Sequence, residues 1–284
     1  MKIELHSHTH YSHQKKVLYD GVNSPEEMVK AAAKKLDAIV ISDHDTLQGY
    51  EEAKKYGKKY GIDVMCGEEI TSRNGHILAI GVNEAVPPKL SVDDTVDRIH
   101  EQGGIAIAAH PFDVKRVGLR DKSKKCDAVE IFNAQNLDRI SNMKAGKFAK
   151  KYKLPRTAGS DAHSTKMIGH GFIEVKADDM GSLIRSIKKD HAVLHTRYMP
   201  LNIIMDMAIK RLQLSYDHVV NYSDKNYSMP KRFVAKKMLT LVNRYPGRIN
   251  PLFRAMTYVS LGGVITYSAY REIANILDRI FPDL

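Results

Sequence analysis

Cysteine and tryptophan are scarce in this sequence of 284 residues, which contains two cysteines and no tryptophan. Two cysteines are too few for a disulfide scaffold or a thiolate zinc cluster. We therefore expect Cys66 and Cys126 to be small buried thiols, as is typical of a reducing compartment. The opening segment, MKIELHSHTH, also lacks the basic and apolar regions of a signal peptide, so we expect a cytoplasmic location.

Long apolar runs are lacking as well. The apolar stretch between Arg254 and Arg271 has 16 residues, whereas a helix that spans a bilayer needs roughly 20. It predicts a buried or interfacial helix, not a transmembrane one. Acidic residues are outnumbered too, since 33 Asp and Glu stand against 44 Lys and Arg and leave a net charge of +11. The remaining composition, 43% hydrophobic and 27% charged, excludes disordered and fibrous classes.

Short apolar runs alternate with amphipathic stretches up to about residue 195. Residues 24–27, Ser-Pro-Glu-Glu, predict the start of a helix with an N-cap serine, a first-turn proline and two acids. Alternation over this length predicts an α/β fold with a mostly parallel sheet, either open or closed into a barrel. Strands are expected at residues 2–5, 37–42, 62–70, 75–82, 105–110, 127–133, 156–163, 172–177 and 192–196.

The pattern changes after residue 198. Strand signals become rare, and apolar residues recur at helical spacing. Residues 201–284 carry 12 basic and 6 acidic side chains, so over half of the excess positive charge lies in less than a third of the chain. We predict an α/β domain at residues 1–198 and a basic, mainly helical C-terminal extension at residues 199–284.

Histidine is abundant, with 13 residues in all, and many histidines follow the predicted strands together with carboxylates. The H-x-H pattern at His6 and His8 points both imidazoles to one side of a strand. Parallel strands present their carboxyl ends on one side of a sheet, where active sites are built. Residues from five strands are therefore expected to meet there. They are His6, His8, His44, Glu68, Glu69, His110, Asp161 and His163, with His13 on a following loop and His76 at the opening of a strand.

These side chains together favour a metal centre. A lone histidine is most often a surface or satisfied core residue, so His100, His191, His195 and His218 receive no role. A nitrogen and oxygen donor set without thiolate suits Zn, Mn or Fe. Eight or nine ligands exceed the need of one ion. Two or three divalent ions that share a bridging carboxylate are the economical explanation, and such sites are typical of phosphoester hydrolases.

Six motifs occur in the order HSHTHYSH, SDHDT, GEEI, GHILAIG, AHPF and GSDAH. This series resembles that of the PHP (polymerase and histidinol phosphatase) family of metal-dependent phosphoesterases. The resemblance covers about residues 1–195. It implies a distorted, seven-stranded (β/α) barrel with a trinuclear metal centre.

The resemblance also implies a ligand set for each ion. Glu69 would bridge two ions, because Glu69 and not Glu68 matches the G-x-E-[IL] spacing. Residues 11–14 read Tyr-Ser-His-Gln where shorter members usually have Tyr-Ser-Asp-Gly, and some relatives use histidine for that ligand. The three sets would be His6, His8, Glu69 and Asp161, then Glu69, His76 and His110, and finally His13, His44 and His163.

Three further residues are candidates for a catalytic role. A protonated group can assist the leaving oxygen, and Asp45 and His10 are the candidates for it. Arg116 lies in the basic stretch that follows the AHP motif, and arginine suits bidentate contact with phosphate. A solvated basic loop is the alternative interpretation of that stretch.

The basic clusters at residues 115–125, 144–156 and 209–254 bear on the substrate. Our first hypothesis is hydrolysis of a phosphomonoester of a small metabolite or nucleotide, through attack of a metal-activated hydroxide on phosphorus. The alternative is an exonuclease on single-stranded nucleic acid, with the basic C-terminal extension holding the backbone. A third hypothesis is a non-catalytic, metal-stabilised module that binds nucleic acid or an anionic membrane surface.

Overall fold

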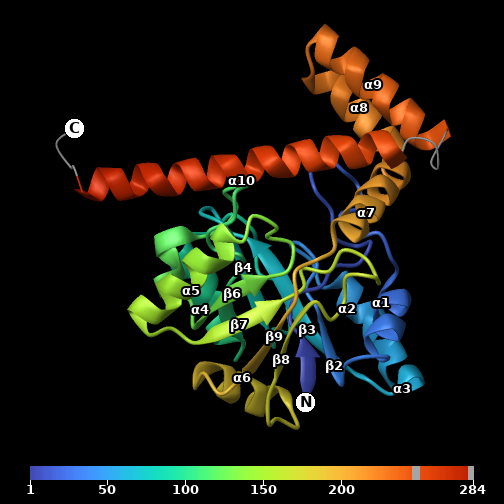
Figure 1. Ribbon diagram of the computed structural model, residues 1–284. Coiled ribbons are helices and arrows are strands. Elements are labelled where there is room, and N and C mark those ends of the chain that lie inside the picture. The colour runs from blue at the N-terminus through green and yellow to red at the C-terminus, as the bar shows by residue number, and fades with distance from the viewer. Residues whose placement is uncertain (245–249, 281–284) are drawn as a thin grey trace.

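One sheet of nine strands organises the chain (Figure 1). The computed structural model describes residues 1–244 and 250–280. The strands follow one another across the sheet in the order β7-β6-β5-β4-β3-β2-β1-β8-β9. They are β1 (Lys2–Glu4), β2 (Ala38–Ile41), β3 (Asp63–Thr71), β4 (His76–Ile80), β5 (Ile105–Ala108), β6 (Ala128–Asn133), β7 (Arg156–Gly159), β8 (Gly171–Glu174) and β9 (Val193–Thr196).

Strands β1 to β7 curl into a nearly closed barrel. A parallel bridge between Ser7 and Ala162 joins the chain beyond β1 to the chain beyond β7. It is held by the amide of His8, which donates to the Ala162 carbonyl at 2.8 Å, and by the Ala162 amide, which donates to His6 at 3.0 Å. The predicted α/β barrel is confirmed. The sheet has nine strands instead of seven because β8 pairs with the other edge of β1 and β9 extends it.

Half of the strand pairs are antiparallel, so the prediction of a mostly parallel sheet is wrong. Two of the four antiparallel pairs involve β8, and the other two involve β4, which a short turn from Thr71 to His76 joins to β3. Parallel strands need a crossover of a dozen or more residues, which this turn cannot supply. As a result β4 begins at the end of the barrel where β3 finishes, and His76 stands opposite Thr71.

Helices surround the barrel, and the first begins as the sequence predicts. The Ser24 hydroxyl accepts the Glu27 amide at 3.3 Å, and the Glu27 carboxylate accepts the Ser24 amide at 2.9 Å, which makes a capping box with Pro25 in the first turn. The helices are α1 (Pro25–Ala32), α2 (Gln48–Ala53), η1 (Lys54–Tyr56), α3 (Gly57–Tyr60), α4 (Val92–Glu101), η2 (Arg120–Lys125), α5 (Ile140–Tyr152), α6 (Met180–Lys188), α7 (Leu201–Leu214), α8 (Tyr216–Asn226), α9 (Met229–Arg244) and α10 (Asn250–Ile280).

The C-terminal helices share a core with the barrel. Met199 and Met207 belong to the same buried cluster as Met28, Phe132 and Met167. The last strand ends at Thr196, and the part of the chain described after Leu201 is helical. Helix α7 therefore contributes to the core of the region before it. The division into two domains at residue 198 stays a prediction.

The 31-residue helix α10 crosses over the barrel, while α8 and α9 project beyond it as a pair (Figure 1). One side of α10 faces the barrel, since the buried Ser268 hydroxyl donates to Asp138 at 3.0 Å. The other side exposes Tyr258, Val259 and Tyr270. Within the described residues, no helix has both the length and the apolarity to cross a bilayer.

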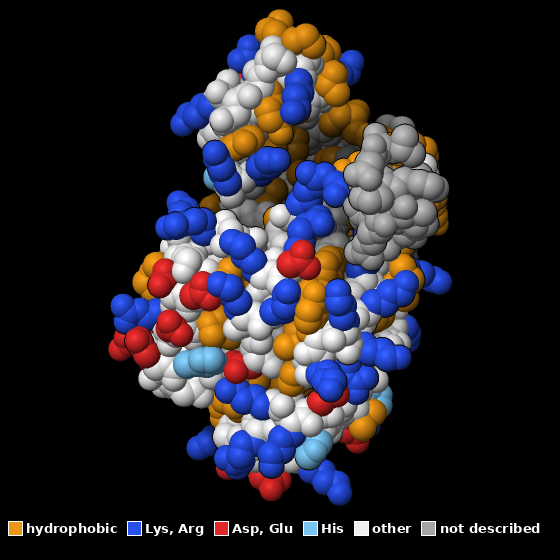
Figure 2. All heavy atoms as spheres, turned by 90° about the vertical axis from the view of Figure 1, so that its left-hand side faces the viewer, with side chains coloured by type: hydrophobic (Ala, Val, Ile, Leu, Met, Phe, Trp, Pro, Cys, Tyr) orange, Lys and Arg blue, Asp and Glu red, His pale blue; other side chains and the backbone are white. Residues whose placement is uncertain are grey.

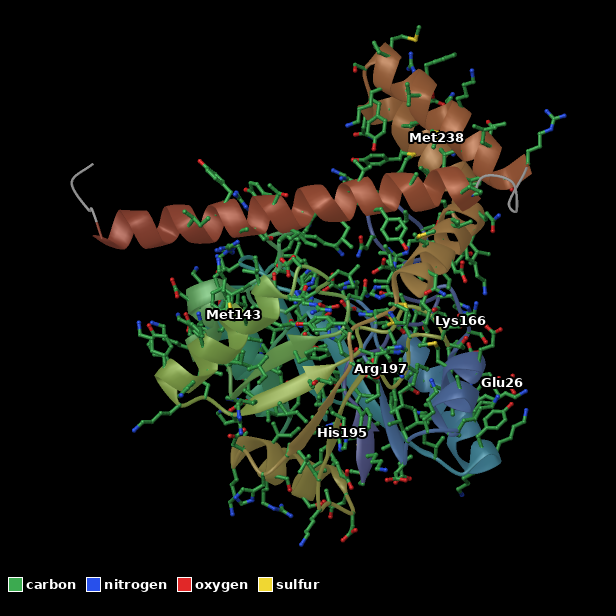
Figure 3. All side chains as sticks on the ribbon, in the orientation of Figure 1. Glu26, Met143, Lys166, His195, Arg197 and Met238 are labelled. Atoms are coloured by element: carbon green, nitrogen blue, oxygen red, sulfur yellow. The ribbon has the colours of Figure 1, made fainter. Side chains whose placement is uncertain are left out.

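The two cysteines and His195 have no predicted role in the site, and they lie outside it. Cys66 and Cys126 are buried free thiols, as expected, and burial raises the pKa of both to about 12. His195 contacts Glu174 at 2.8 Å on the β8–β9 hairpin. Figure 3 shows His195 and Arg197 low on the barrel, away from α10.

Asp127, which precedes β6, ties three elements together, and its loss should weaken the fold. Its carboxylate accepts hydrogen bonds from the His100 ring at 2.7 Å and the Ala106 amide at 2.9 Å, and pairs with Lys188 at 3.1 Å. Burial alone would raise the pKa of Asp127, but these three partners hold it below its usual value. Asp127→Asn should lower the free energy of unfolding at pH 7 by about 1–3 kcal/mol.

The effect should depend on pH in a defined direction. Because the pKa of Asp127 is lower in the folded protein, the stabilisation is present above about pH 4 and is lost as the pH falls through the folded value. Urea unfolding at pH 7 measures the stability with Asp127 ionised, and unfolding near pH 3 measures it with Asp127 largely protonated. The exposed Asp121→Asn is the control. A deficit that is equally large at both pH values would contradict this account.

Candidate metal centre

Imidazoles and carboxylates from six strands meet at one end of the barrel. His6 and His8 follow β1, His44 follows β2, and Glu69 lies in β3. His76 joins them because the antiparallel β4 begins at that end. The structure brings together eight of the nine predicted metal ligands in groups whose donor atoms lie within 4.8 Å of one another. They are His6, His8, His44, Glu69, His76, His110, Asp161 and His163.

Glu69 stands at the centre of the group, and its two oxygens face different imidazoles. Oε1 lies 2.8 Å from His76 Nδ1 and 2.9 Å from His110 Nε2. Oε2 lies 3.2 Å from the Nε2 atoms of both His6 and His8 and 3.4 Å from that of His44. One carboxylate therefore reaches two separate sets of nitrogen donors, as a bridging ligand must.

Asp161 is a second carboxylate that several imidazoles approach. Its Oδ1 lies 3.5 Å from His6 Nε2 and 3.3 Å from both His8 Nε2 and His163 Nδ1. Asp161 has a φ of 52°, in the left-handed region that costs a non-glycine residue free energy. This backbone turn directs the carboxylate back over the barrel end.

The spacing and the unsatisfied polar atoms fit a bound cation. Ligand atoms about 2.1 Å from a tetrahedral or octahedral ion lie about 3.0–3.4 Å from one another. The His8 contacts to Glu69 and Asp161, at 3.2 and 3.3 Å, have this spacing. His8 Nε2 is also buried without a hydrogen-bond partner among the described residues. A divalent ion would bind the lone pair of that nitrogen.

The charges of the group favour the same conclusion. Burial alone would raise the pKa of Glu69, but the surrounding His44, His76 and His6 hold it well below its usual range. Burial alone would lower the pKa of His8, yet Asp161 and Glu69 raise it to about 9. The carboxylates therefore stay ionised in a buried setting, which requires compensating positive charge.

Glu68, the neighbour of Glu69, points away from the group. Its Oε2 accepts the Val86 amide at 2.9 Å. Burial raises the pKa of Glu68 to about 7. Adjacent residues of a strand face opposite sides, so only one of the two glutamates can enter the centre.

Asp20 is a member of the centre that the sequence reasoning missed. Its Oδ2 lies 3.0 Å from His163 Nε2 and 3.4 Å from His44 Nε2. The carboxylate is fully buried. A signal was present, because Asp20 is the only acidic residue between Glu4 and Glu26. It lies outside regular secondary structure, so no periodicity marked it.

Arg211 reaches the centre from the C-terminal helix α7. Its Nη2 lies 2.9 Å from Asp20 Oδ1. Burial alone would raise the pKa of Asp20, but His163, His44 and Arg211 hold it well below its usual range. The predicted C-terminal extension thus contributes a side chain to the site, and no pattern in the sequence predicts this contribution.

Two predicted histidines are not brought to the group. The His13 ring is exposed and contacts the Leu18 carbonyl, whereas Asp20 lies beside His44 and His163. His10 packs its ring against Tyr11 and Tyr19 and does not line the cavity. His13 lines the cavity over the centre but lies outside the grouped ligands.

Of the other two catalytic candidates, Asp45 lines the cavity and Arg116 does not. Asp45 lines the cavity over the centre, and its Oδ1 accepts the Thr71 amide at 2.7 Å. Arg116 does not line that cavity and instead donates to the Tyr267 hydroxyl of α10 at 2.9 Å. Its φ of 64° turns the loop so that Lys115 enters the cavity in its place.

Glu130 on β6 supports the centre from behind and was also missed. Its Oε1 lies 3.0 Å from His6 Nδ1, and its Oε2 accepts the His110 amide at 2.8 Å. A carboxylate on the far nitrogen of a ligating histidine fixes the ring orientation and raises its basicity. Gly159 makes room for this contact, because a Cβ there would lie 2.3 Å from Glu130 Oε1. A charged residue inside the apolar run DAVEIFN was the available signal.

A cavity of about 620 Å³ lies over the group. Its floor contains the imidazoles and carboxylates, and its rim contains Lys15 and Lys115. Leu201 of α7 and Leu261 of α10 line the opposite wall. Access to the centre is therefore shaped by helices from the C-terminal region.

The two adjacent glutamates give a matched pair of variants. Glu69→Gln should remove at least one bound equivalent of divalent metal, because an amide cannot supply two anionic oxygens to two sets of imidazoles. Glu68→Gln should keep the metal content of the wild type. Elemental analysis after dialysis against limiting Mn²⁺ or Zn²⁺ measures both, and equal metal loss in the two variants would contradict the placement of Glu69.

Asp20 and His13 can be compared in the same way. Asp20→Asn should lower metal affinity about 10- to 100-fold, the usual scale for loss of one supporting contact at a metal site. His13→Ala should leave the affinity unchanged, because its ring lies outside the group. Titration of metal-free protein with a competing chelator distinguishes the two residues. A larger loss in His13→Ala would restore the assignment made from the motif.

Comparisons with known proteins agree with this geometry. A sequence model described as the PHP domain matches residues 4–143, and one described as PHP-associated matches residues 139–191. An uncharacterised protein of Methanocaldococcus jannaschii is 40% identical over 149 residues, which cover 50% of this chain and 87% of that protein.

Two curated enzymes and one solved structure are also similar. A 5′-3′ exoribonuclease of Haemophilus influenzae is 30% identical over 111 residues, 37% of this chain and 38% of that protein. A phosphoribosyl 1,2-cyclic phosphate 1,2-diphosphodiesterase of Eggerthella lenta is 26% identical over 136 residues, 43% of this chain and 49% of that protein. A two-domain protein from Bacteroides vulgatus, containing a predicted PHP-like metal-dependent phosphoesterase, has a TM-score of 0.56 at 17% identity and covers 74% of this chain and 69% of that chain. The chain belongs to the PHP-domain family and is a metal-dependent hydrolase of phosphoester bonds.

Proposed function

We propose that this enzyme hydrolyses a phosphomonoester of a small metabolite or nucleotide. The observation that carries the proposal is the position of Glu69, whose two oxygens face separate imidazole sets beneath a cavity of limited size. Centres with a shared carboxylate bind both the attacking and the leaving oxygens of an in-line displacement.

The ligands divide into three groups in this proposal. His6, His8, Glu69 and Asp161 would hold one ion, and Glu69 with His76 and His110 would hold a second. His44 and His163 would hold a third, with Asp20 as its carboxylate in place of the predicted His13. Bound Mn, Zn or Fe ions would lower the pKa of a water ligand and neutralise phosphoryl oxygens.

The cavity supports a small substrate. Its volume of about 620 Å³ lies within the roughly 300–1,000 Å³ typical of small-molecule sites. Apolar side chains of α7 and α10, including Ile204 and Val264, face the polar floor. Such a wall excludes water and strengthens the electrostatic contacts inside.

Cationic side chains on the rim would hold the phosphoryl group. Lys15, Lys115 and Arg211 all line the cavity. Arg211 has a second reason to bind an anion, since its buried Nε lacks a hydrogen-bond partner in the described part of the chain. Asp45 remains the candidate to protonate the leaving oxygen, because it lies in the cavity and His10 does not.

Exonuclease activity is the second candidate. The similarity to a 5′-3′ exoribonuclease favours it, as does the spread of Lys and Arg over the face that carries α4 and α5 (Figure 2). The non-catalytic hypothesis is set aside, because membership of the family indicates a hydrolase.

Parallel assays distinguish the two candidates. With Mn²⁺, Zn²⁺ or Fe²⁺ added, the wild type should release phosphate from an aryl phosphate and from nucleotides, with higher kcat/KM than for cleavage of a labelled single-stranded oligonucleotide. Asp161→Ala is the inactive control. Cleavage of the oligonucleotide alone would favour the exonuclease, and no cleavage of any phosphoester by the wild type would overturn the proposal.

Arg211 and its exposed neighbour Lys210 provide a matched test of the α7 contribution. Arg211→Ala should lower kcat/KM for the preferred phosphomonoester about 10- to 100-fold, because it removes a charge-assisted contact of about 1.5–3 kcal/mol. Lys210→Ala, on the exposed side of the same helix, should retain wild-type activity. Equal rates for wild type and Arg211→Ala would show that α7 takes no part.

A further inference from the structure

A second pocket lies beside the metal-binding cavity and is rich in arginine. It is formed by the loop after β5, by α5 and by α10. Its cationic side chains are Arg116, Arg120, Lys144 and Arg271, and Tyr267 lies among them. We call this set the arginine pocket.

The arginine pocket adjoins the metal-binding cavity. Asp113, Val114 and Asp138 line both spaces. A molecule whose reacting group lies at the metal centre could therefore extend past these residues. It would meet positive charge at its other end.

Two of the arginines in the arginine pocket share one hydroxyl group. The Tyr267 hydroxyl accepts from Arg116 Nη2 at 2.9 Å and from Arg271 Nη1 at 3.4 Å. The hydrogen bonds from Arg271 and Arg116 lower the pKa of Tyr267. Among the side chains that the structure describes, no carboxylate forms an ion pair with Arg116, Arg120 or Arg271.

The two nearby acids accept hydrogen bonds from groups other than the arginines. Asp113 Oδ1 accepts the amides of Val117 and Gly118 at 3.1 and 2.9 Å, while its Oδ2 is buried without a hydrogen-bond partner among the described residues. Asp138 Oδ2 accepts from the hydroxyls of Ser141 and Ser268 at 2.8 and 3.0 Å. Both carboxylates therefore fix the loop, α5 and α10 in place, while the guanidinium groups keep donors for a ligand.

The loop that carries the arginines adopts an unfavourable backbone to do so. Arg116 and Arg120 have φ values of 64° and 52°, in the left-handed region where non-glycine residues are uncommon. The Arg120 amide donates to the Pro111 carbonyl at 2.9 Å, which holds this conformation. Such backbone costs persist where the surrounding contacts determine them, and they concentrate at ligand sites.

We propose that the arginine pocket binds a second anionic group of the substrate, so that the preferred substrate is a small phosphoester with an additional phosphate. This inference rests on the proposed function of the metal centre. Planar guanidinium groups bind phosphate oxygens in pairs. Tyr267 and Arg271 lie beyond residues 4–191, which the PHP and PHP-associated models match, so α10 adds a preference that the family regions alone do not contain.

A series of linear alkanediol phosphates with three to eight carbons tests the proposal. Each diol is compared as its monophosphate and as its bisphosphate, with phosphate release measured in the presence of the activating metal. The bisphosphate should have at least about a tenfold higher kcat/KM at one favoured chain length. Equal values at every length would overturn the proposal while leaving the proposed phosphatase function in place.

Matched double variants locate the effect. Arg116→Ala/Arg271→Ala should reduce the ratio of bisphosphate to monophosphate kcat/KM to near one. Lys122→Ala/Lys147→Ala removes the same charge from exposed positions outside the arginine pocket and should preserve the wild-type ratio. A preference that survives the arginine variant, or that both variants lose equally, would contradict a specific site.

Binding gives a result that does not depend on catalysis. Calorimetric titration of the full chain with inorganic phosphate, after removal of metal, should show an affinity that the arginine variant weakens at least about tenfold and the lysine variant keeps. If no diol phosphate is cleaved, the proposed function fails and this titration still decides the arginine pocket. Equal phosphate affinity in wild type and arginine variant would overturn it.

Discussion

The buried carboxylate of Glu69 is the constraint on which the site depends. It is 1% exposed and lies within 3.4 Å of five imidazoles. An ionised carboxylate is costly to bury unless positive charge and hydrogen-bond donors surround it. Those donors come from the ends of separate strands, so the barrel must hold its strand ends in register for the group to exist. The short bridge between Ser7 and Ala162 closes the barrel. It lies next to His6, His8 and Asp161 in the chain, so closure of the barrel also positions these three ligands.

The support behind the centre is as specific as the centre itself. Glu130 orients both His6 and the loop of His110, and Gly159 leaves the space for its side chain. Asp43 fixes the other side, because its Oδ2 accepts the Thr9 hydroxyl at 2.7 Å. These contacts hold the imidazoles in place before any ion binds, which reduces the ordering that binding must impose.

The C-terminal helices are part of the site and not an appended tail. Helix α7 supplies Arg211 to Asp20, and α10 supplies Tyr267 to Arg116. Met207 places α7 in the barrel core. The sequence predicts this basic region as a surface for polyanions, and that stays a prediction. One of its arginines, Arg211, lines the cavity over the metal centre.

The sequence by itself determined the barrel elements and most of the centre, because H-x-H, D-x-H and strand-end glutamate positions follow from the period of a strand. It could not determine Asp20, which lies in an irregular loop, or Arg211, which is more than 190 residues distant in the chain from its partner. It also placed Arg116 in the catalytic cavity, whereas a left-handed backbone turns that side chain towards α10. Those positions depend on loop conformation and on the packing of α7 and α10, which only the tertiary structure fixes.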